Sequence, residues 1–185
     1  MENTLVEDAP WAWYIVRSSG IMALLFLYLT LFLGLAIKTP LVRDIIRPIY
    51  SLGAHCWLSS QVLFFALIHA LALLFDKYLA LNLGDIFIPF YSNFHTTLMT
   101  LGILSLYLIV IIVGTSHLKH LIAWKFWRGT HYLYIVLYPA ILIHSFYLGT
   151  DLKSPILRTI FLIFGGALGV LLIIKLFSSN RFHRA

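Results

Sequence analysis

The sequence predicts an all-α integral membrane protein, a bundle of about five transmembrane helices. Of its 185 residues, 61% are hydrophobic and only 11% are charged, whereas soluble domains carry about 25% charged residues. The apolar residues form runs close to the ~20 residues that span a bilayer as a helix. No run alternates as a strand does, and unpaired backbone polar groups are costly in lipid. We therefore expect one helical domain over residues 1–185.

Five apolar runs divide the chain. The first ends before Pro40, which cannot continue a helix, and the second ends at Asp76. The fourth contains Pro139, and the fifth begins at Pro155, a residue suited to a first helical turn. The predicted helices cover approximately residues 13–37, 49–75, 96–113, 130–148 and 155–177.

The charges predict the orientation of the bundle. The net charge is +6, and most basic residues follow the first, third and fifth runs: Lys38, Arg43, Arg47, Lys119, Lys125, Arg128, Lys175, Arg181 and Arg184. Six of the seven acids lie on the opposite side: Glu2, Glu7, Asp8, Asp76, Asp85 and Asp151. The positive-inside rule places the N-terminus outside and the C-terminus in the cytoplasm. Topology thus explains the basic charge, and we expect membrane lipid, and no nucleic acid, as a partner of these charges.

Histidines in the second and fourth runs carry the predicted chemistry. Because these two runs are parallel, His55 is level with His131 near the cytoplasm, and His69 is level with His144 toward the exterior. Each level offers two imidazoles, which are the two axial ligands that an iron porphyrin needs inside a helical bundle. We expect haem b between His55 and His131 and between His69 and His144. The single cysteine, Cys56, and the absence of a C-x-x-C-H motif argue against covalently attached haem.

The spacing of these histidines favours two haems. His55 and His69 are 14 residues apart, so they share a helix face and their levels are roughly 20 Å apart. His131 and His144 are 13 residues apart, which on an ideal helix leaves them more than about 90° apart. We expect Pro139 to distort the helix and re-aim one ring. A single haem that uses three of the four histidines is the alternative.

Other interpretations of the ionisable residues stay open. A histidine inside a membrane also serves as a hydrogen-bonding residue between helices, and a transporter or channel would use histidines to relay protons or bind a metal ion. Zinc is disfavoured because neither level adds a carboxylate or thiolate to its two imidazoles. Arg17, near the exterior end of the first run, suits a haem propionate or a lipid headgroup.

A family resemblance rests on the two ligand helices. The second run reads SLGAHCWLSSQVLFFALIHALALL and the fourth reads HYLYIVLYPAILIHSF. The Leu-Gly-x-His opening and the 14- and 13-residue spacings resemble the ferric reductase-like transmembrane domain. That domain is shared by ferric reductases, NADPH oxidases and the haem-binding membrane subunit of bacterial methionine sulfoxide reductase. The stretch TLGILSLYLIVIIVGTSHLKHLIAWKFWRGTHYLYI is similar to that last subunit, and the resemblance covers about residues 17–149.

The resemblance implies a membrane electron-transfer subunit of an oxidoreductase in the bacterial inner membrane. Its donor would be a cytoplasmic flavoreductase or a quinol, and its acceptor ferric iron, oxygen or a periplasmic reductase subunit. The chain ends about eight residues after the last run, so we expect no attached flavin and nicotinamide module, although a flavin cofactor stays compatible with the family. The chain also starts one helix later than the sulfoxide reductase subunit and keeps His55, which favours two haems over one.

Overall fold

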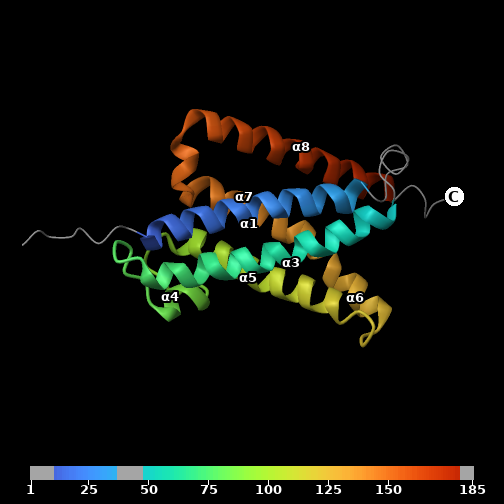
Figure 1. Cartoon of the computed structure of the whole chain (residues 1–185), viewed down its shortest axis with the longest axis horizontal. Coiled ribbons are helices and arrows are strands. Elements are labelled where there is room, and N and C mark those ends of the chain that lie inside the picture. Colours follow the sequence, from blue (N-terminus) through green and yellow to red (C-terminus); the bar gives the residue numbers. More distant parts are fainter. Residues whose placement is uncertain (1–10, 37–47, 180–185) are drawn as a thin grey trace, which may run out of the picture.

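The computed structural model describes residues 11–36 and 48–179 (Figure 1). The acidic N-terminus, the basic loop with Lys38, Arg43 and Arg47, and the tail with Arg181 and Arg184 lie outside these residues. Their part in the topology therefore stays a prediction.

The predicted all-α class is confirmed for the described residues, which contain no strand. Five segments are long and apolar enough to cross a membrane. The long helices are α1 (Trp11–Ala36), α3 (Pro48–Ala72), α5 (Thr96–His117), α7 (Tyr134–Leu148) and α8 (Pro155–Ser179). Shorter elements connect them: η1 (Leu73–Phe75), α4 (Leu83–Phe87), α6 (Trp124–His131) and η2 (Thr150–Lys153).

The helices alternate in direction along the bundle. Figure 1 shows α1, α5 and α8 running one way and α3 and α7 running the other way, so α3, which carries His55 and His69, is parallel to α7, which carries His144. The most extensive helix packing is that of α1 along α3, followed by that of α5 along α7. Contacts between α3 and α5 join these two helix pairs. The helices that pack against α3 and α7, namely α1, α5 and α8, carry none of the four histidines.

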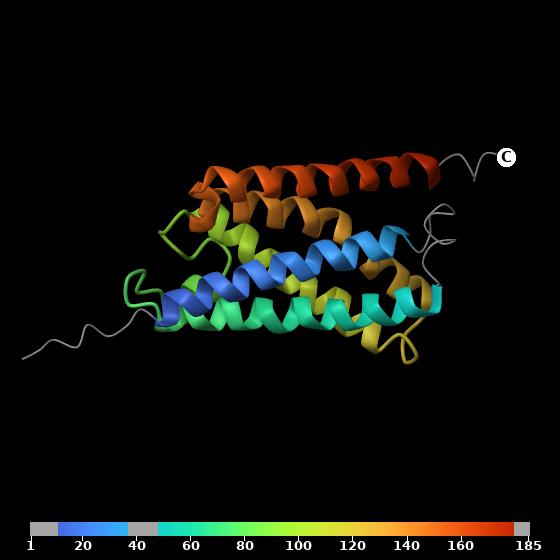
Figure 2. The ribbon, with the colours of Figure 1, turned by 45° about the horizontal axis from the view of Figure 1, so that its top comes forward.

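The α8 helix covers one side of the bundle. In Figure 2 it lies along α7, and it also contacts α1. Its Leu168 and Leu172 are buried against Tyr138 of α7. The Tyr138 hydroxyl donates a hydrogen bond of 2.5 Å to the carbonyl oxygen of Gly165. A directional polar contact therefore joins α7 to α8 inside an otherwise apolar interface.

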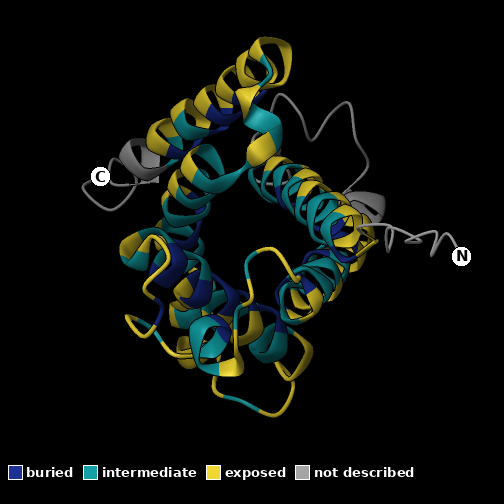
Figure 3. Cartoon of the chain, turned by 90° about the vertical axis from the view of Figure 1, so that its left-hand side faces the viewer, coloured by how far each residue is buried: buried dark blue, intermediate teal, exposed yellow. Residues whose placement is uncertain are grey.

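The core lies at mid-length, while apolar side chains also cover the outside. The central cluster contains Leu27, Val62, Ile109, Val113 and Leu137. Figure 3 shows exposed residues along the outer faces of the helices and buried residues toward the interior. Many of the exposed residues are large and hydrophobic, and contiguous apolar surface of this extent is expected where lipid is the solvent.

Two helix boundaries differ by four residues or more from those predicted. The α5 helix continues to His117 instead of ending at Val113, because its last turn remains hydrogen-bonded although its residues become polar. The fourth span begins at Trp124 instead of Thr130, and it is divided into α6 and α7. The hydropathy of this segment indicates where lipid begins but not where the helix begins.

Candidate functional site

The rings of His55 and His131 lie next to each other near one end of the bundle. Their centroids are 6.3 Å apart, and their planes are inclined by 63°. A metal ion held at about 2 Å from one nitrogen of each ring would place the two centroids roughly 6 Å apart. The separation of the rings therefore suits a shared metal centre.

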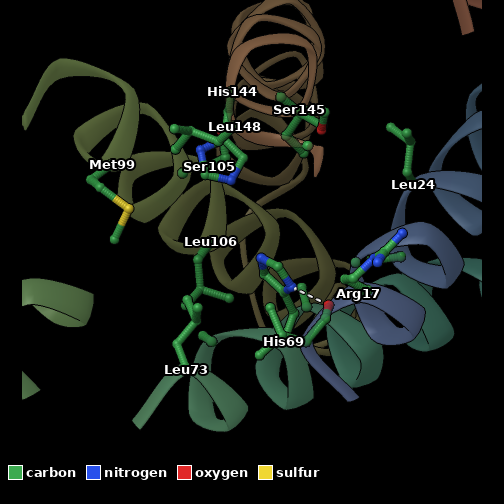
Figure 4. A pocket seen from close by; sticks show the side chains of 18 of the residues that line it. Arg17, Leu24, His69, Leu73, Met99, Ser105, Leu106, His144, Ser145 and Leu148 are labelled. Atoms are coloured by element: carbon green, nitrogen blue, oxygen red, sulfur yellow. Dashed lines mark hydrogen bonds between the residues drawn. The ribbon is translucent and has the colours of Figure 1, made fainter. Parts of the chain in front are cut away.

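His69 and His144 line one cavity toward the other end of the bundle. Its volume is about 470 Å³, and its walls come from α1, α3, α5 and α7. Figure 4 shows the two imidazoles reaching into the cavity from α3 and α7. Pockets for small molecules and cofactors typically have volumes of about 300–1,000 Å³ and mostly apolar walls. This cavity meets both criteria, since aliphatic side chains make up most of its lining.

Three of the four histidines bond to a backbone carbonyl through Nδ1. A carbonyl oxygen only accepts, so Nδ1 must carry the proton, and in the neutral ring Nε2 keeps a lone pair. Histidines that bind metals usually have this arrangement, with the second nitrogen donating to a carbonyl or carboxylate. The three bonds run from His55 to Thr30 (2.9 Å), from His69 to Val16 (2.8 Å) and from His144 to Leu98 (2.8 Å).

His131 is held in a different way. It is the last residue of α6, and its ring stacks on Trp127, one turn earlier, with centroids 5.3 Å apart and planes inclined by 26°. Tyr134, the first residue of α7, approaches the same ring edge-on at 6.1 Å. Aromatic contacts therefore orient this ring from both sides of the break between the two helices.

The break between α6 and α7 changes the angle between His131 and His144. It lies at Tyr132 and Leu133, where several amides bond to the third residue back instead of the fourth. Such bonds wind the chain at about 3.0 residues per turn instead of 3.6, which rotates the following residues further around the axis. This overwinding brings the two histidines closer to a common face. The distortion that we expected at Pro139 thus occurs one to two turns earlier.

The cavity contains a polar atom without a partner. The side chain of Ser105 on α5 is only 2% exposed, and its Oγ has no hydrogen-bond partner among the described residues. A buried hydroxyl in this state costs about 1–3 kcal/mol. A ligand with a polar edge, or a water molecule, would satisfy it. The cavity with His69, His144 and Ser105 is therefore suited to hold more than lipid tails.

Arg17 lies at the rim of the same cavity. Its Nε donates to Asp151 at 3.0 Å, its terminal nitrogen bonds the second carboxylate oxygen, and its guanidinium lies 3.9 Å from the centre of the Trp13 ring. The ion pair joins α1 to η2, and both residues line the cavity. The structure thus gives Arg17 a protein partner, where the sequence suggested a haem propionate or a lipid headgroup.

The remaining described histidines lie apart from these pairs. His95 caps the start of α5 in a left-handed conformation, His117 bonds the Ser60 hydroxyl at 3.1 Å, and His120 is exposed. No group of three or more His, Cys, Asp or Glu side chains in the described part of the chain is arranged to hold a metal ion. The site therefore consists of two imidazole pairs, to which an iron porphyrin would add four nitrogen ligands of its own.

Three glycines and one tryptophan that contact the candidate ligand histidines were not identified as site residues from the sequence. Gly20, Gly34 and Gly102 face the rings of His69, His55 and His144, and Trp127 supports His131. Gly20 and Gly34 are separated by 14 residues, as are His55 and His69. That equal spacing on adjacent helices was a signal that could have identified the first two glycines.

Comparison of the chain with protein-family models, with curated proteins and with solved structures finds no match in any of the three. The resemblance to the ferric reductase-like domain accordingly remains an expectation that rests on the histidine spacing.

Proposed function

We propose that the chain transfers electrons across a membrane by holding b-type haem between His55 and His131 and between His69 and His144. The main support for this proposal is the orientation and protonation of the histidine rings. Three of them bond to backbone carbonyls through Nδ1, which keeps the proton on that nitrogen and the lone pair on Nε2, the arrangement usual in metal-binding histidines. The 6.3 Å separation of His55 and His131 and the cavity between His69 and His144 add independent support.

The residues around the rings suit haem better than a bare metal ion. Two imidazoles leave a zinc ion short of ligands, whereas they complete the coordination of a porphyrin iron. When bound, haem would supply a one-electron carrier, which His55, His131, His69 and His144 would hold. The chain's part is to orient the rings and to exclude water with apolar walls. Ser105 and Arg17 are among the polar groups that would lie beside a cofactor in the cavity between His69 and His144.

The charges support a direction for the transfer. Among the described residues, the α5–α6 end has Lys119, Lys125, Arg128 and Lys175, and the opposite end has Arg17, Lys77, Lys153 and Arg158. The excess of basic residues on the α5–α6 side therefore comes from the sequence that follows the first and fifth apolar runs. By the positive-inside rule the α5–α6 end faces the cytoplasm, in keeping with a bacterial inner membrane protein. The donor would be a flavoreductase or a quinol, and the acceptor ferric iron, oxygen or a reductase subunit outside. The chain would then be the membrane subunit of an oxidoreductase of the ferric reductase-like family.

The direct test is the haem content of the purified full-length protein. We expect an absorption spectrum typical of low-spin b-type haem and a pyridine haemochrome count near two per chain. His69→Ala and His144→Ala should each remove one haem, and so should His55→Ala and His131→Ala. His120→Ala, which changes an exposed histidine outside both pairs, is the control.

Three results would count against the proposal in different ways. Protein that folds but contains no haem would reject it, and pH-dependent ion flux through such protein would favour a transporter or channel. Equal haem content in His69→Ala, His144→Ala and the control would reject the ligand assignment. A count near one haem per chain would select the alternative that uses three histidines.

A further inference from the structure

Three histidine rings each pack against the same local arrangement of a backbone carbonyl and a glycine. In each case the ring bonds the carbonyl of one residue and contacts the glycine four residues later in the same neighbouring helix. We call each carbonyl–glycine pair a seat. The seats are Val16/Gly20 for His69, Thr30/Gly34 for His55 and Leu98/Gly102 for His144.

Helix geometry explains why the glycine stands at this position. In an α-helix the carbonyl of residue i accepts the amide of residue i+4, so each seat carbonyl already bonds the glycine amide. The carbonyl oxygen has a second lone pair, and the imidazole Nδ1 uses it. The ring must therefore approach the helix directly beside residue i+4, where any larger residue places its Cβ.

The space at these glycines is filled by the histidine rings. A Cβ on Gly20 would lie 3.0 Å from His69 Nδ1, and one on Gly34 would lie 3.1 Å from His55 Cε1. On Gly102 it would lie 2.5 Å from His144 Cε1 and 2.7 Å from Nδ1. The requirement for glycine is thus local, and it is strictest at Gly102.

Close helix packing is the ordinary role of glycine in membrane helices, and it does not explain this pattern. Small residues there let two backbones approach each other. At the three seats, however, the nearest atoms are imidazole atoms. Gly114 on α5 and Gly53 on α3 have nothing within 4 Å of a Cβ. Gly114 therefore provides a control on the same helix as Gly102, and Gly53 provides one on the helix that carries His55.

We infer that Gly20, Gly34 and Gly102 are positioning residues, which let three histidines reach a shared backbone carbonyl. Each seat fixes the proton on Nδ1, stops rotation of the ring and presents Nε2 to the interior. The inference that these histidines are protonated at Nδ1 depends only on the structure. The consequence for a bound haem rests on the proposed function.

Nitrogen NMR of the full chain tests the tautomer without any cofactor. In protein produced without haem and labelled with ¹⁵N-histidine, the wild type should show three rings protonated at Nδ1. Gly102→Ala should shift or broaden the His144 signals alone, and Gly114→Ala should leave all of them unchanged. Equal spectra for Gly102→Ala and wild type, or an equal disturbance by Gly114→Ala, would overturn the inference.

The haem-loaded protein provides the second readout. A histidine that loses the bond from Nδ1 to the carbonyl becomes a weaker electron donor to iron. We therefore expect the haem that uses His144 to have a higher midpoint potential and altered electron paramagnetic resonance g-values in Gly102→Ala. The haem that uses His55 should keep its values, and Gly114→Ala should match the wild type. Unchanged potential and g-values in Gly102→Ala would refute the positioning role.

A second variant keeps the inference testable if Gly102→Ala does not fold. In Gly34→Ala the new Cβ would lie 3.1 Å from His55 Cε1, which is a milder contact than that at Gly102. The His55 signals then report the effect, and Gly53→Ala is the control. The NMR result also separates the two proposals. Wild-type protein without haem would reject the proposed function, while its histidine signals would still decide whether the seats exist.

Discussion

At the scale of single residues, the four candidate ligands are not equivalent. His55, His69 and His144 are fixed through Nδ1 to a neighbouring helix. His131 instead depends on ring stacking against Trp127 of its own helix. Stacked aromatic pairs contribute about 0.5–1.5 kcal/mol beyond the area that they bury. We therefore expect the His55/His131 pair to tolerate change in its aromatic neighbours less well than the His69/His144 pair.

Replacing Trp127 should affect only one of the two pairs. Trp127→Leu removes the stacked ring, so we expect the affinity for haem between His55 and His131 to fall by about fivefold or more, as the loss of ~1 kcal/mol implies. Haem between His69 and His144 should be retained. Haem titration followed by absorption spectroscopy measures both sites. Phe126→Leu changes an exposed aromatic on the same helix and is the control; equal losses in the two variants would contradict the role of Trp127.

The ion pair of Arg17 and Asp151 predicts opposite shifts in redox potential. A positive charge beside a haem favours the reduced form, and a negative charge favours the oxidised form. Arg17→Gln should therefore lower the midpoint potential of the haem between His69 and His144, and Asp151→Asn should raise it. Both residues are partly exposed, so screening keeps the shifts small. Potentiometric titration measures them, and shifts of the same sign would show that the pair acts through structure and not through charge.

At the scale of helices, the length and apolar composition of the five runs predicted most of what the structure contains. The starts of α5 and α8 agree with the predicted residues 96 and 155, and Pro155 marks the second of them. The division of the fourth span at Tyr132 and Leu133 was not predicted, because hydropathy is averaged over a window longer than the break. Pro139 indicated that the helix is irregular but not where.

The contacts around the site could be predicted only in part. The sequence gives the depth of each histidine through its position in an apolar run, and the structure places His55 beside His131 and His69 and His144 in one cavity. The seats at Gly20, Gly34 and Gly102 depend on the axial offset between neighbouring helices. That offset follows from side-chain packing along their whole length, which spacing in one chain does not specify.

The docking of α8 onto α7 depends on one hydrogen bond that a conservative substitution removes. Tyr138→Phe leaves the ring but not the hydroxyl that donates to the Gly165 carbonyl. We expect a loss of about 1 kcal/mol in the free energy of unfolding, the usual range for such bonds in membrane proteins. Unfolding in detergent mixtures measures this. Tyr147→Phe, at a side chain that is 68% exposed, should cost less; an equal effect would show that the bond contributes nothing.

At the scale of the whole molecule, orientation in the membrane is the property that the charges predict. Tyr78 is 92% exposed in the turn between η1 and α4, and His120 is exposed between α5 and α6, at the opposite end of the bundle. In a Cys56→Ser background, Tyr78→Cys should react with an impermeant maleimide on intact cells. His120→Cys should react only in inverted vesicles. The reverse pattern would place the N-terminus inside and reverse the proposed direction of electron transfer.

One helix without any candidate ligand links the two ends of the bundle. The α1 helix holds His69 through Val16 and Gly20, and it holds His55 through Thr30 and Gly34. Since a helix is stiff along its axis, a displacement of α1 by a lipid or partner protein would move both seats together. If the chain holds haem as proposed, a partner bound at one surface of the membrane would thereby alter the haem nearest the other surface, without contacting it.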